Sequence, residues 1–259
     1  MLAGFFRKMN EKVSIITPCY NGAKYIGETI ESVQAQNYTD WEMLIVNDGS
    51  SDDSEKIVSS YAAKDPRITL INQKNGGSAN ARNNGIRHAT GRYIALLDAD
   101  DLWNPDFLSS QIAFLKEKNA AVVCSSYAHI DENSQVFGKV DVAKPVITVK
   151  DMYVMNRIGC LTGLYDAGTY GKIYLREELK SLRDDYAYWL DCVKKTGVAY
   201  GNQKVLARYR VLGSSTTGNK KKLIRVQWRF YREYLHLNPF QALMNLCRWG
   251  AAGLKKFRS

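Results

Sequence analysis

The feature that most constrains the fold of this chain is a short apolar run, rich in β-branched residues, that recurs through the first half. The five runs are centred on Ile15, Leu44, Leu70, Ile94 and Val122. Their centres lie 29, 26, 24 and 28 residues apart, which is the length of one strand plus one crossover helix. This alternation predicts an α/β fold with a mostly parallel sheet flanked by helices.

The composition narrows the classes of protein to which the chain can belong. Of its 259 residues, 45% are hydrophobic and 24% are charged, which is typical of a globular protein with one substantial domain. No apolar run is long enough to span a bilayer, and residues 1–8 lack the order of a secretory signal, so we expect a cytoplasmic protein. The five cysteines show no CxxC spacing, which argues against a zinc site or a disulfide framework.

The positive charge is concentrated near the end of the chain. The net charge is 36 − 26 = +10. Residues 220–259 hold ten basic side chains and one acidic side chain, which gives +9 and leaves +1 for residues 1–219. A basic face across the whole body would indicate nucleic acid, so we expect no nucleic-acid partner. We expect a main domain at residues 1–219 and a basic amphipathic helical tail at residues 220–259 that meets an anionic surface.

Residues that could bind a ligand or take part in a reaction follow four of the predicted strands. They are Thr17, Pro18 and Tyr20 after the first strand, Asp48 after the second, Gly76 and Arg82 after the third, and Asp98 and Asp100 after the fourth. In parallel sheets, ligands bind beyond the carboxyl ends of the strands. We therefore expect these residues to share one site.

The pair of carboxylates at Asp98 and Asp100 suggests a metal site. Side chains two residues apart on an extended strand point to the same side, so both carboxylates would face one spot. Convergent carboxylates repel each other unless a cation compensates them, and Mg²⁺ or Mn²⁺ commonly does so together with substrate phosphates. The alternative is a cluster of helix N-cap residues before Asn104–Pro105.

Two further segments each allow two interpretations. The glycines Gly76 and Gly77 follow a strand and open a helix, as a phosphate-binding loop would, but they lack GxGxxG and GK[ST], and a plain glycine turn is the alternative. The pair Asp184–Asp185 is either an exposed acidic pair on a helix or includes a general base that faces the cleft.

Together these segments resemble the family 2 glycosyltransferases of the GT-A fold, particularly bacterial enzymes that extend O-antigen or capsular polysaccharides on lipid carriers. The stretches that match are VSIITPCYNG (13–22), IVNDGSSD (45–52), NGGSANARN (75–83) and YIALLDADD (93–101). A weaker similarity continues at 183–190 and 209–215. The resemblance implies a nucleotide-sugar-binding half at residues 12–108 and an acceptor-side half at residues 109–219.

The resemblance also implies roles for the site residues. The residues implied to bind the donor are Thr17, Pro18, Tyr20, Asp48, Gly76, Arg82 and Asp98, with the last at the ribose side. Asp100 would ligate Mn²⁺ or Mg²⁺ on the diphosphate, and Asp185 would be the general base of an inverting displacement. The sequence has Trp189–Cys192 where many processive members carry QxxRW, which implies addition of a single sugar.

The implied activity is transfer of one sugar from a nucleotide sugar, expected to be a UDP-sugar, to a hydroxyl of a lipid-linked glycan. Two other classes remain open. A sugar nucleotidyltransferase would need basic residues in the first strand–helix turn, where Pro18–Gly22 has none. A non-catalytic module that binds nucleotide sugars would have no use for a carboxylate at Asp185.

The pattern of the tail predicts two helices. The first, from Leu223 to Leu237, has an apolar face beside a basic stripe, and Asn238–Pro239 is typical of the cap and first turn of the second. The apolar faces either pack on the main domain or lie in an anionic leaflet, and the second helix fits the leaflet better. We therefore expect a peripheral enzyme on the inner face of the plasma membrane.

Overall fold

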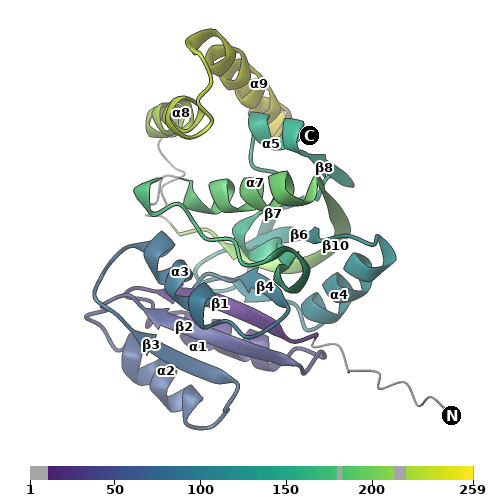
Figure 1. The fold of residues 1–259 in the computed structure, drawn as a ribbon. Coiled ribbons are helices and arrows are strands. Elements are labelled where there is room, and N and C mark those ends of the chain that lie inside the picture. The colour runs from purple at the N-terminus through teal and green to yellow at the C-terminus, as the bar shows by residue number, and fades with distance from the viewer. Residues whose placement is uncertain (1–10, 180–182, 213–219, 259) are drawn as a thin grey trace, which may run out of the picture.

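The computed structural model describes residues 11–179, 183–212 and 220–258. At its centre is a sheet in the order β3-β2-β1-β4-β9-β6-β10-β5, with β7 paired to β6 and β8 paired to β10 (Figure 1). The strands are β1 (Val13–Cys19), β2 (Trp41–Asn47), β3 (Ile68–Asn72), β4 (Tyr93–Leu96), β5 (Leu102–Trp103), β6 (Val122–Ile130), β7 (Val136–Asp141), β8 (Val146–Thr148), β9 (Leu164–Asp166) and β10 (Val198–Arg210).

The two halves of the sheet are built differently. Strand β1 pairs in parallel with β2 and β4, and β2 pairs in parallel with β3, which confirms the parallel arrangement expected from the spacing of the first four runs. Beyond β4 the sheet is mixed. Strand β9 lies between β4 and β6 and is antiparallel to both, whereas β6 and β10 are parallel. The fifth predicted run, β6, is therefore not the neighbour of β4.

Helices cover both faces of the sheet (Figure 1). They are α1 (Ile26–Gln34), α2 (Ser54–Ala62), α3 (Ser78–His88), α4 (Phe107–Glu117), α5 (Val149–Val154), α6 (Ala167–Tyr170) and α7 (Asp184–Thr196), with short 3₁₀ turns η1 (Cys160–Thr162) and η2 (Glu177–Leu179). Successive strand residues enter opposite cores, because Ile15 packs with α1, α2 and α4 and Ile16 packs with α3 and α7.

The tail forms α8 (Lys220–Arg229), a π-helical turn η4 (Phe230–Tyr234) and α9 (Pro239–Arg258). Its first part packs on the main domain rather than facing outward. The ring of Phe230 stacks on that of Tyr186 with centroids 4.3 Å apart, and the Tyr234 hydroxyl donates to Asp191 at 2.6 Å. Of the two alternatives for this apolar face, packing on the domain is the one that the structure shows.

Helix α9 begins as the sequence predicts and has two contrasting faces. The Asn238 side chain accepts the Gln241 N–H at 2.9 Å, and the Gln241 side chain accepts the Asn238 N–H at 3.2 Å. Ala242 is buried, whereas Phe240, Leu243 and Met244 are 72%, 53% and 43% exposed. In the described part of the chain, no helix combines the length and the apolar character needed to cross a membrane.

Candidate active site

A cleft of about 700 Å³ opens at the carboxyl ends of β1, β2 and β4 and at the start of α3. Six of the predicted site residues line it, namely Pro18, Tyr20, Asp48, Arg82, Asp98 and Asp100. They come from four consecutive strand ends that the parallel half of the sheet places at one edge. Tyr20 is 57% exposed, so its ring is available to a ligand.

Asp48 organises the glycine loop that forms one wall of the cleft. Its Oδ1 accepts the N–H of Gly76 at 2.8 Å and the side-chain amide of Gln73 at 2.8 Å, and its Oδ2 accepts the N–H of Gly77 at 2.9 Å. Gly77 has φ +84°, a value that favours glycine. The carboxylate of Asp48 thus fixes the entry to α3 and already has three donors.

Arg82 joins the two acidic segments of the site. It lies on α3, is 6% exposed, and donates to Asp98 Oδ1 at 2.5 Å and to Asp184 Oδ2 at 3.0 Å. The Ser78 hydroxyl donates to the same oxygen of Asp184 at 2.9 Å. A buried guanidinium between two carboxylates is well compensated, so this bridge ties the start of α7 to the turn after β4.

Asp98 and Asp100 share the cleft, but not by strand alternation. Strand β4 ends at Leu96, and both aspartates lie in the following turn. The expectation that an extended strand aligns them is therefore wrong, although the expected convergence on one site holds. Burial, together with the negative charge of Asp98, raises the pKa of Asp100 to about 6.

This pair of carboxylates fits a hard divalent cation. One oxygen of Asp98 is held by Arg82, and Asp100 lines the cleft beside it, so carboxylate groups of both residues border the same space. In the described residues, no set of three or more His, Cys, Asp or Glu side chains could hold a metal by itself. Mg²⁺ and Mn²⁺ commonly complete such a pair with phosphate oxygens and water.

Arg210, at the end of β10, is hydrogen-bonded to the turn that carries Asp100 and Asp101. Its side chain is fully buried, and its Nε donates to the Asp100 carbonyl at 2.7 Å while its backbone N–H donates to Asp101 Oδ1 at 2.8 Å. Its other nitrogens reach Glu28 at 3.0 Å and Ser134 at 3.0 Å. One guanidinium thus connects the turn after β4 at residues 98–101 (the aspartate turn), α1 and the turn between β6 and β7.

Asp185 lies in the first turn of α7, next to Asp184. It is half-buried, and the side-chain amide of Asn156 donates to its Oδ2 at 3.4 Å. Burial, together with the negative charge of Asp184, raises the pKa of Asp185 to about 6. The charges of Arg82 and Asp98 also act on Asp185, although it is not among the residues that line the cleft. A carboxylate with this pKa suits a general base near neutral pH.

Two predicted residues lie away from the cleft surface. Thr17 is fully buried, and the N–H of Gly76 donates to Asp48. Neither residue is among those that line the cleft. The cleft is also lined by residues that no sequence pattern indicated, namely Lys24, Tyr25, Ser78 and Leu212. Nor did any pattern indicate Arg210 or the bridge from Asp184, because both depend on contacts between segments more than 100 residues apart.

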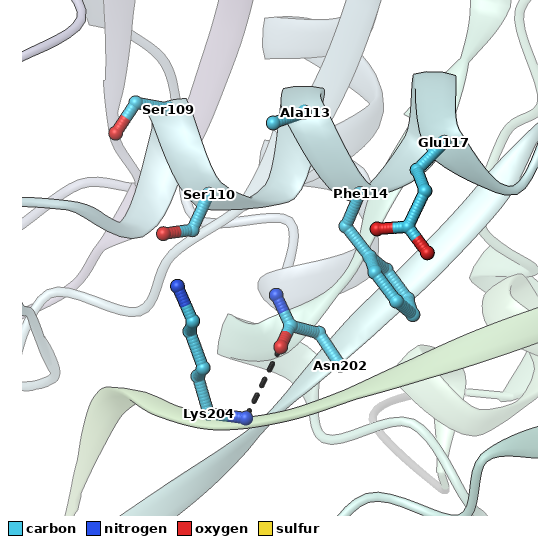
Figure 2. A pocket seen from close by; sticks show the side chains of 7 residues that line it. All are labelled: Ser109, Ser110, Ala113, Phe114, Glu117, Asn202 and Lys204. Carbon is cyan, nitrogen blue, oxygen red and sulfur yellow. Dashed lines mark hydrogen bonds between the residues drawn. The ribbon is translucent and has the colours of Figure 1, made fainter.

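A second hollow of about 440 Å³ lies between α4 and β10 (Figure 2). Ser110, Phe114 and Glu117 line it from the helix, and Asn202 and Lys204 line it from the strand. The side chain of Asn202 accepts the N–H of Lys204 at 3.1 Å, as the dashed line shows. None of the predicted site residues lies here, so the cleft above β1 and β4 is the candidate site.

The profile of the family described as Glycosyl transferase family 2 matches residues 14–183, which include every residue predicted to contact the donor. The chain belongs to glycosyl transferase family 2. It is therefore a glycosyltransferase, and the nucleotidyltransferase and the binding module are set aside. The match ends just before Asp184, so the proposed base lies beyond it.

Family 2 relatives match almost the whole chain. TuaG of Bacillus subtilis (strain 168), named for teichuronic acid biosynthesis, is 36% identical over 245 residues, which cover 94% of this chain and 96% of TuaG. WfgD of Escherichia coli, named as a UDP-Glc:α-D-GlcNAc-diphosphoundecaprenol β-1,3-glucosyltransferase, is 34% identical over 246 residues, 94% of each chain.

Solved structures confirm the GT-A fold. TarS 1–349 of S. aureus in complex with UDP-GlcNAc superposes with a TM-score of 0.70 at 22% identity, over 92% of this chain and 71% of that one. The mannosyltransferase PcManGT of Pyrobaculum calidifontis, in complex with GDP-Man and Mn²⁺, gives a TM-score of 0.66 at 18% identity, over 92% and 68%.

Proposed function

We propose that this enzyme transfers one sugar from a UDP-sugar to a hydroxyl of a lipid-linked glycan in bacterial cell-surface polysaccharide synthesis. Two relatives that match nearly end to end support this proposal. One is named for teichuronic acid biosynthesis and the other for glucosyl transfer to a sugar on diphosphoundecaprenol. We place the reaction on the cytoplasmic side of the plasma membrane, where the enzyme would be peripheral.

The observation that carries the mechanism is the Arg82 bridge. It holds Asp98, on the donor side, and Asp184, beside the proposed base, on one buried guanidinium. Asp185 would accept the proton of the acceptor hydroxyl as that oxygen attacks the anomeric carbon and the nucleoside diphosphate departs. Because attack and departure occur on opposite sides, the reaction would invert the configuration of the transferred sugar.

The donor would lie in the cleft with its diphosphate towards the aspartate turn. Asp100 and the remaining oxygen of Asp98 would hold Mn²⁺ or Mg²⁺, which when bound neutralises charge on the leaving diphosphate. Tyr20 and Pro18 would contact the nucleoside. Asp48 would act partly through the glycine loop, since three hydrogen bonds already occupy it, and Thr17 would support this wall from below.

We also propose that α9 holds the enzyme on an anionic membrane. The first part of the tail packs on the main domain through Phe230 and Tyr231. By contrast, Phe240, Leu243 and Met244 form an exposed apolar face on α9. Arg248 is exposed on the same helix, and residues 220–259 carry ten basic side chains against one acidic side chain. Basic amphipathic helices of this kind lie in the interface of anionic leaflets.

The replacement Asp185→Asn tests the mechanism. We expect it to lower transfer by about 10²–10⁴-fold, the usual contribution of a general base, while UDP binding measured by calorimetry stays near wild type. Because protonated Asp185 cannot accept a proton, wild-type kcat/KM should rise with pH through about 6, and the residual activity of the variant should lack this rise.

Asp191→Asn is the matched control, because Asp191 lies on the same helix but pairs with Arg176 and Tyr234. It should keep the rise in rate with pH. Near-normal transfer by Asp185→Asn would show that another group accepts the proton.

A further inference from the structure

Two arginines beside the proposed base lack a close counter-ion in the described part of the chain. Arg157 and Arg183 are half-buried, and the Nε atom of each is buried without a hydrogen-bond partner. Neither side chain forms an ion pair within 4.0 Å in the described part of the chain, and the charge of Asp185 acts on Arg183 from beyond that distance. An arginine cannot shed its charge at physiological pH, so a half-buried guanidinium without a partner favours an anion from outside the chain.

Three other buried or half-buried arginines differ from this pair because each of them forms an ion pair, although the Nε of Arg82 also lacks a hydrogen-bond partner. Arg82 bridges Asp98 and Asp184, Arg92 pairs with Asp166 at 2.8 Å, and Arg210 pairs with Glu28 at 3.0 Å. The two unpaired guanidinium groups lie instead on segments that converge on Asp185.

Each arginine is adjacent in sequence to a residue that lies beside the proposed base. Arg157 follows Asn156, whose amide donates to Asp185 at 3.4 Å, and Arg183 precedes the pair Asp184–Asp185 at the start of α7. The charges of both arginines act on the buried hydroxyl of Tyr186, so both side chains lie in the neighbourhood of that residue. Arg183 has φ +59°, a left-handed conformation that arginine rarely adopts and that turns the chain sharply before α7.

The tail contributes to the same place. The guanidinium of Arg183 lies 5.8 Å from the ring centre of Trp249, on the inner side of α9. The helix with the exposed apolar face therefore contacts the residue that precedes the acidic pair. A lipid chain that leaves this point towards α9 would reach the face formed by Phe240, Leu243 and Met244.

We propose that Arg157 and Arg183 bind the diphosphate that links the acceptor sugar to its lipid. This inference rests on the proposed function, because it takes Asp185 as the base that receives the acceptor hydroxyl. In the acceptor named for WfgD, the accepting sugar is joined directly to a diphosphate. A site for that group must then lie about one sugar ring from the base, and both arginines adjoin the base: Arg157 follows Asn156, which donates to Asp185, and the charge of Asp185 acts on Arg183.

The first experiment measures anion binding without any acceptor. The full chain is saturated with UDP to fill the donor site and is titrated with inorganic pyrophosphate in the absence of metal. We expect saturable binding that weakens roughly tenfold or more in Arg157→Gln and in Arg183→Gln, as expected when a charge-assisted hydrogen bond is lost. Arg208→Gln removes the same charge on β10, where Arg208 donates to Asn104 at 2.9 Å, and should bind like wild type.

The second experiment compares two acceptors in solution: a sugar on a short-chain lipid diphosphate and the same sugar as a neutral alkyl glycoside. We expect wild type to have the lower KM for the diphosphate, and Arg157→Gln to raise this KM towards the neutral value with little change in kcat. Arg183→Lys keeps the charge near Trp249 and should retain most of the preference. Binding to vesicles of anionic lipid should be the same in Arg157→Gln and wild type.

The outcomes separate this inference from the proposed function. Asp185→Asn should lose transfer and keep pyrophosphate binding, so failure of the base assignment leaves the anion site measurable. Equal pyrophosphate binding in all variants, or equal use of both acceptors by wild type, overturns the inference. It is also overturned if the arginine variants weaken only vesicle binding, since the anion would then be a membrane headgroup.

Discussion

The carboxylates of the site differ in what already surrounds them, and this difference separates their functions. Asp48 accepts three hydrogen bonds from its own chain, and Asp98 is held by Arg82. Asp100 lines the cleft and Asp185 lies at the start of α7, and burial raises the pKa of each to about 6. Asp48 is therefore suited to positioning, and Asp98 keeps one oxygen beyond its bond with Arg82. Asp100 is suited to binding a cation and Asp185 to binding a proton.

The replacement Asp100→Ala should weaken UDP binding only when Mn²⁺ is present, because its proposed partner is the ion and not the nucleotide. Asp98→Ala should weaken binding in both conditions, since it also releases Arg82 from one of its two carboxylates. Calorimetry with Mn²⁺ and with EDTA distinguishes the two variants. Undiminished transfer in EDTA would remove the metal from the mechanism.

At this scale the sequence predicted which residues gather but not how they are held. Six of the predicted residues line the cleft because parallel strands end at one edge. Thr17 lies below the surface, since strand alternation directs its side chain into the core. The role of Asp184 as a partner of Arg82 required the position of α7, which no local pattern indicates.

Among the elements, the spacing of apolar runs predicted β1 to β4, because one crossover helix of similar length separates each pair. The same argument fails for β9, a three-residue strand that pairs antiparallel between β4 and β6. Its segment is too short for a periodic pattern, and its place depends on pairing with distant strands. Strand β10, which has 13 residues and ends at Arg210, is similarly placed by its pairing with β5, β6 and β8.

We expect Arg210→Gln to weaken UDP binding in Mn²⁺ by about tenfold and to leave binding in EDTA nearly unchanged. The physical reason is that the guanidinium holds the Asp100 carbonyl, and loss of a charged hydrogen bond costs about 1.5–3 kcal/mol. The melting temperature should also fall, because Glu28 loses its buried partner. Calorimetry and thermal unfolding measure the two effects separately.

Arg208→Gln is the control for this effect, because Arg208 lies two residues earlier on β10 and bonds to Asn104. It should leave both UDP affinities unchanged. If Arg210→Gln lowers the melting temperature but keeps the full gain in UDP affinity from Mn²⁺, then Arg210 contributes to stability and does not position Asp100.

In the whole molecule, the tail connects the region around α7 to the outer surface. Phe230 and Tyr231 are buried in the core that also holds α3 and α7, and Trp249 contacts Arg183. Removing residues 239–259 would therefore disturb the domain, since Ala242 is buried and Asn245 donates to the Tyr153 carbonyl at 3.3 Å. Point variants on the exposed face of α9 test membrane binding without this damage.

The triple variant Phe240→Ser, Leu243→Ser, Met244→Ser should lose binding to anionic vesicles while keeping UDP affinity. Burying an apolar side chain contributes about 1.5–3 kcal/mol, so loss of three such contacts should weaken vesicle binding by about tenfold at least. Wild-type binding should also fall with added salt, because each basic residue near an anionic surface contributes about 1 kcal/mol that ions screen. Vesicle co-sedimentation at low and high salt measures both effects.

The control variant is Val136→Ser, Phe137→Ser, which removes two exposed apolar side chains on β7, outside the tail. It should bind vesicles like wild type, because a general loss of surface hydrophobicity is not what the proposal invokes. If both variants bind equally well, or if wild type ignores anionic vesicles at low salt, α9 does not hold the enzyme on the membrane. The acceptor lipid would then have to reach Asp185 without help from the exposed face of α9.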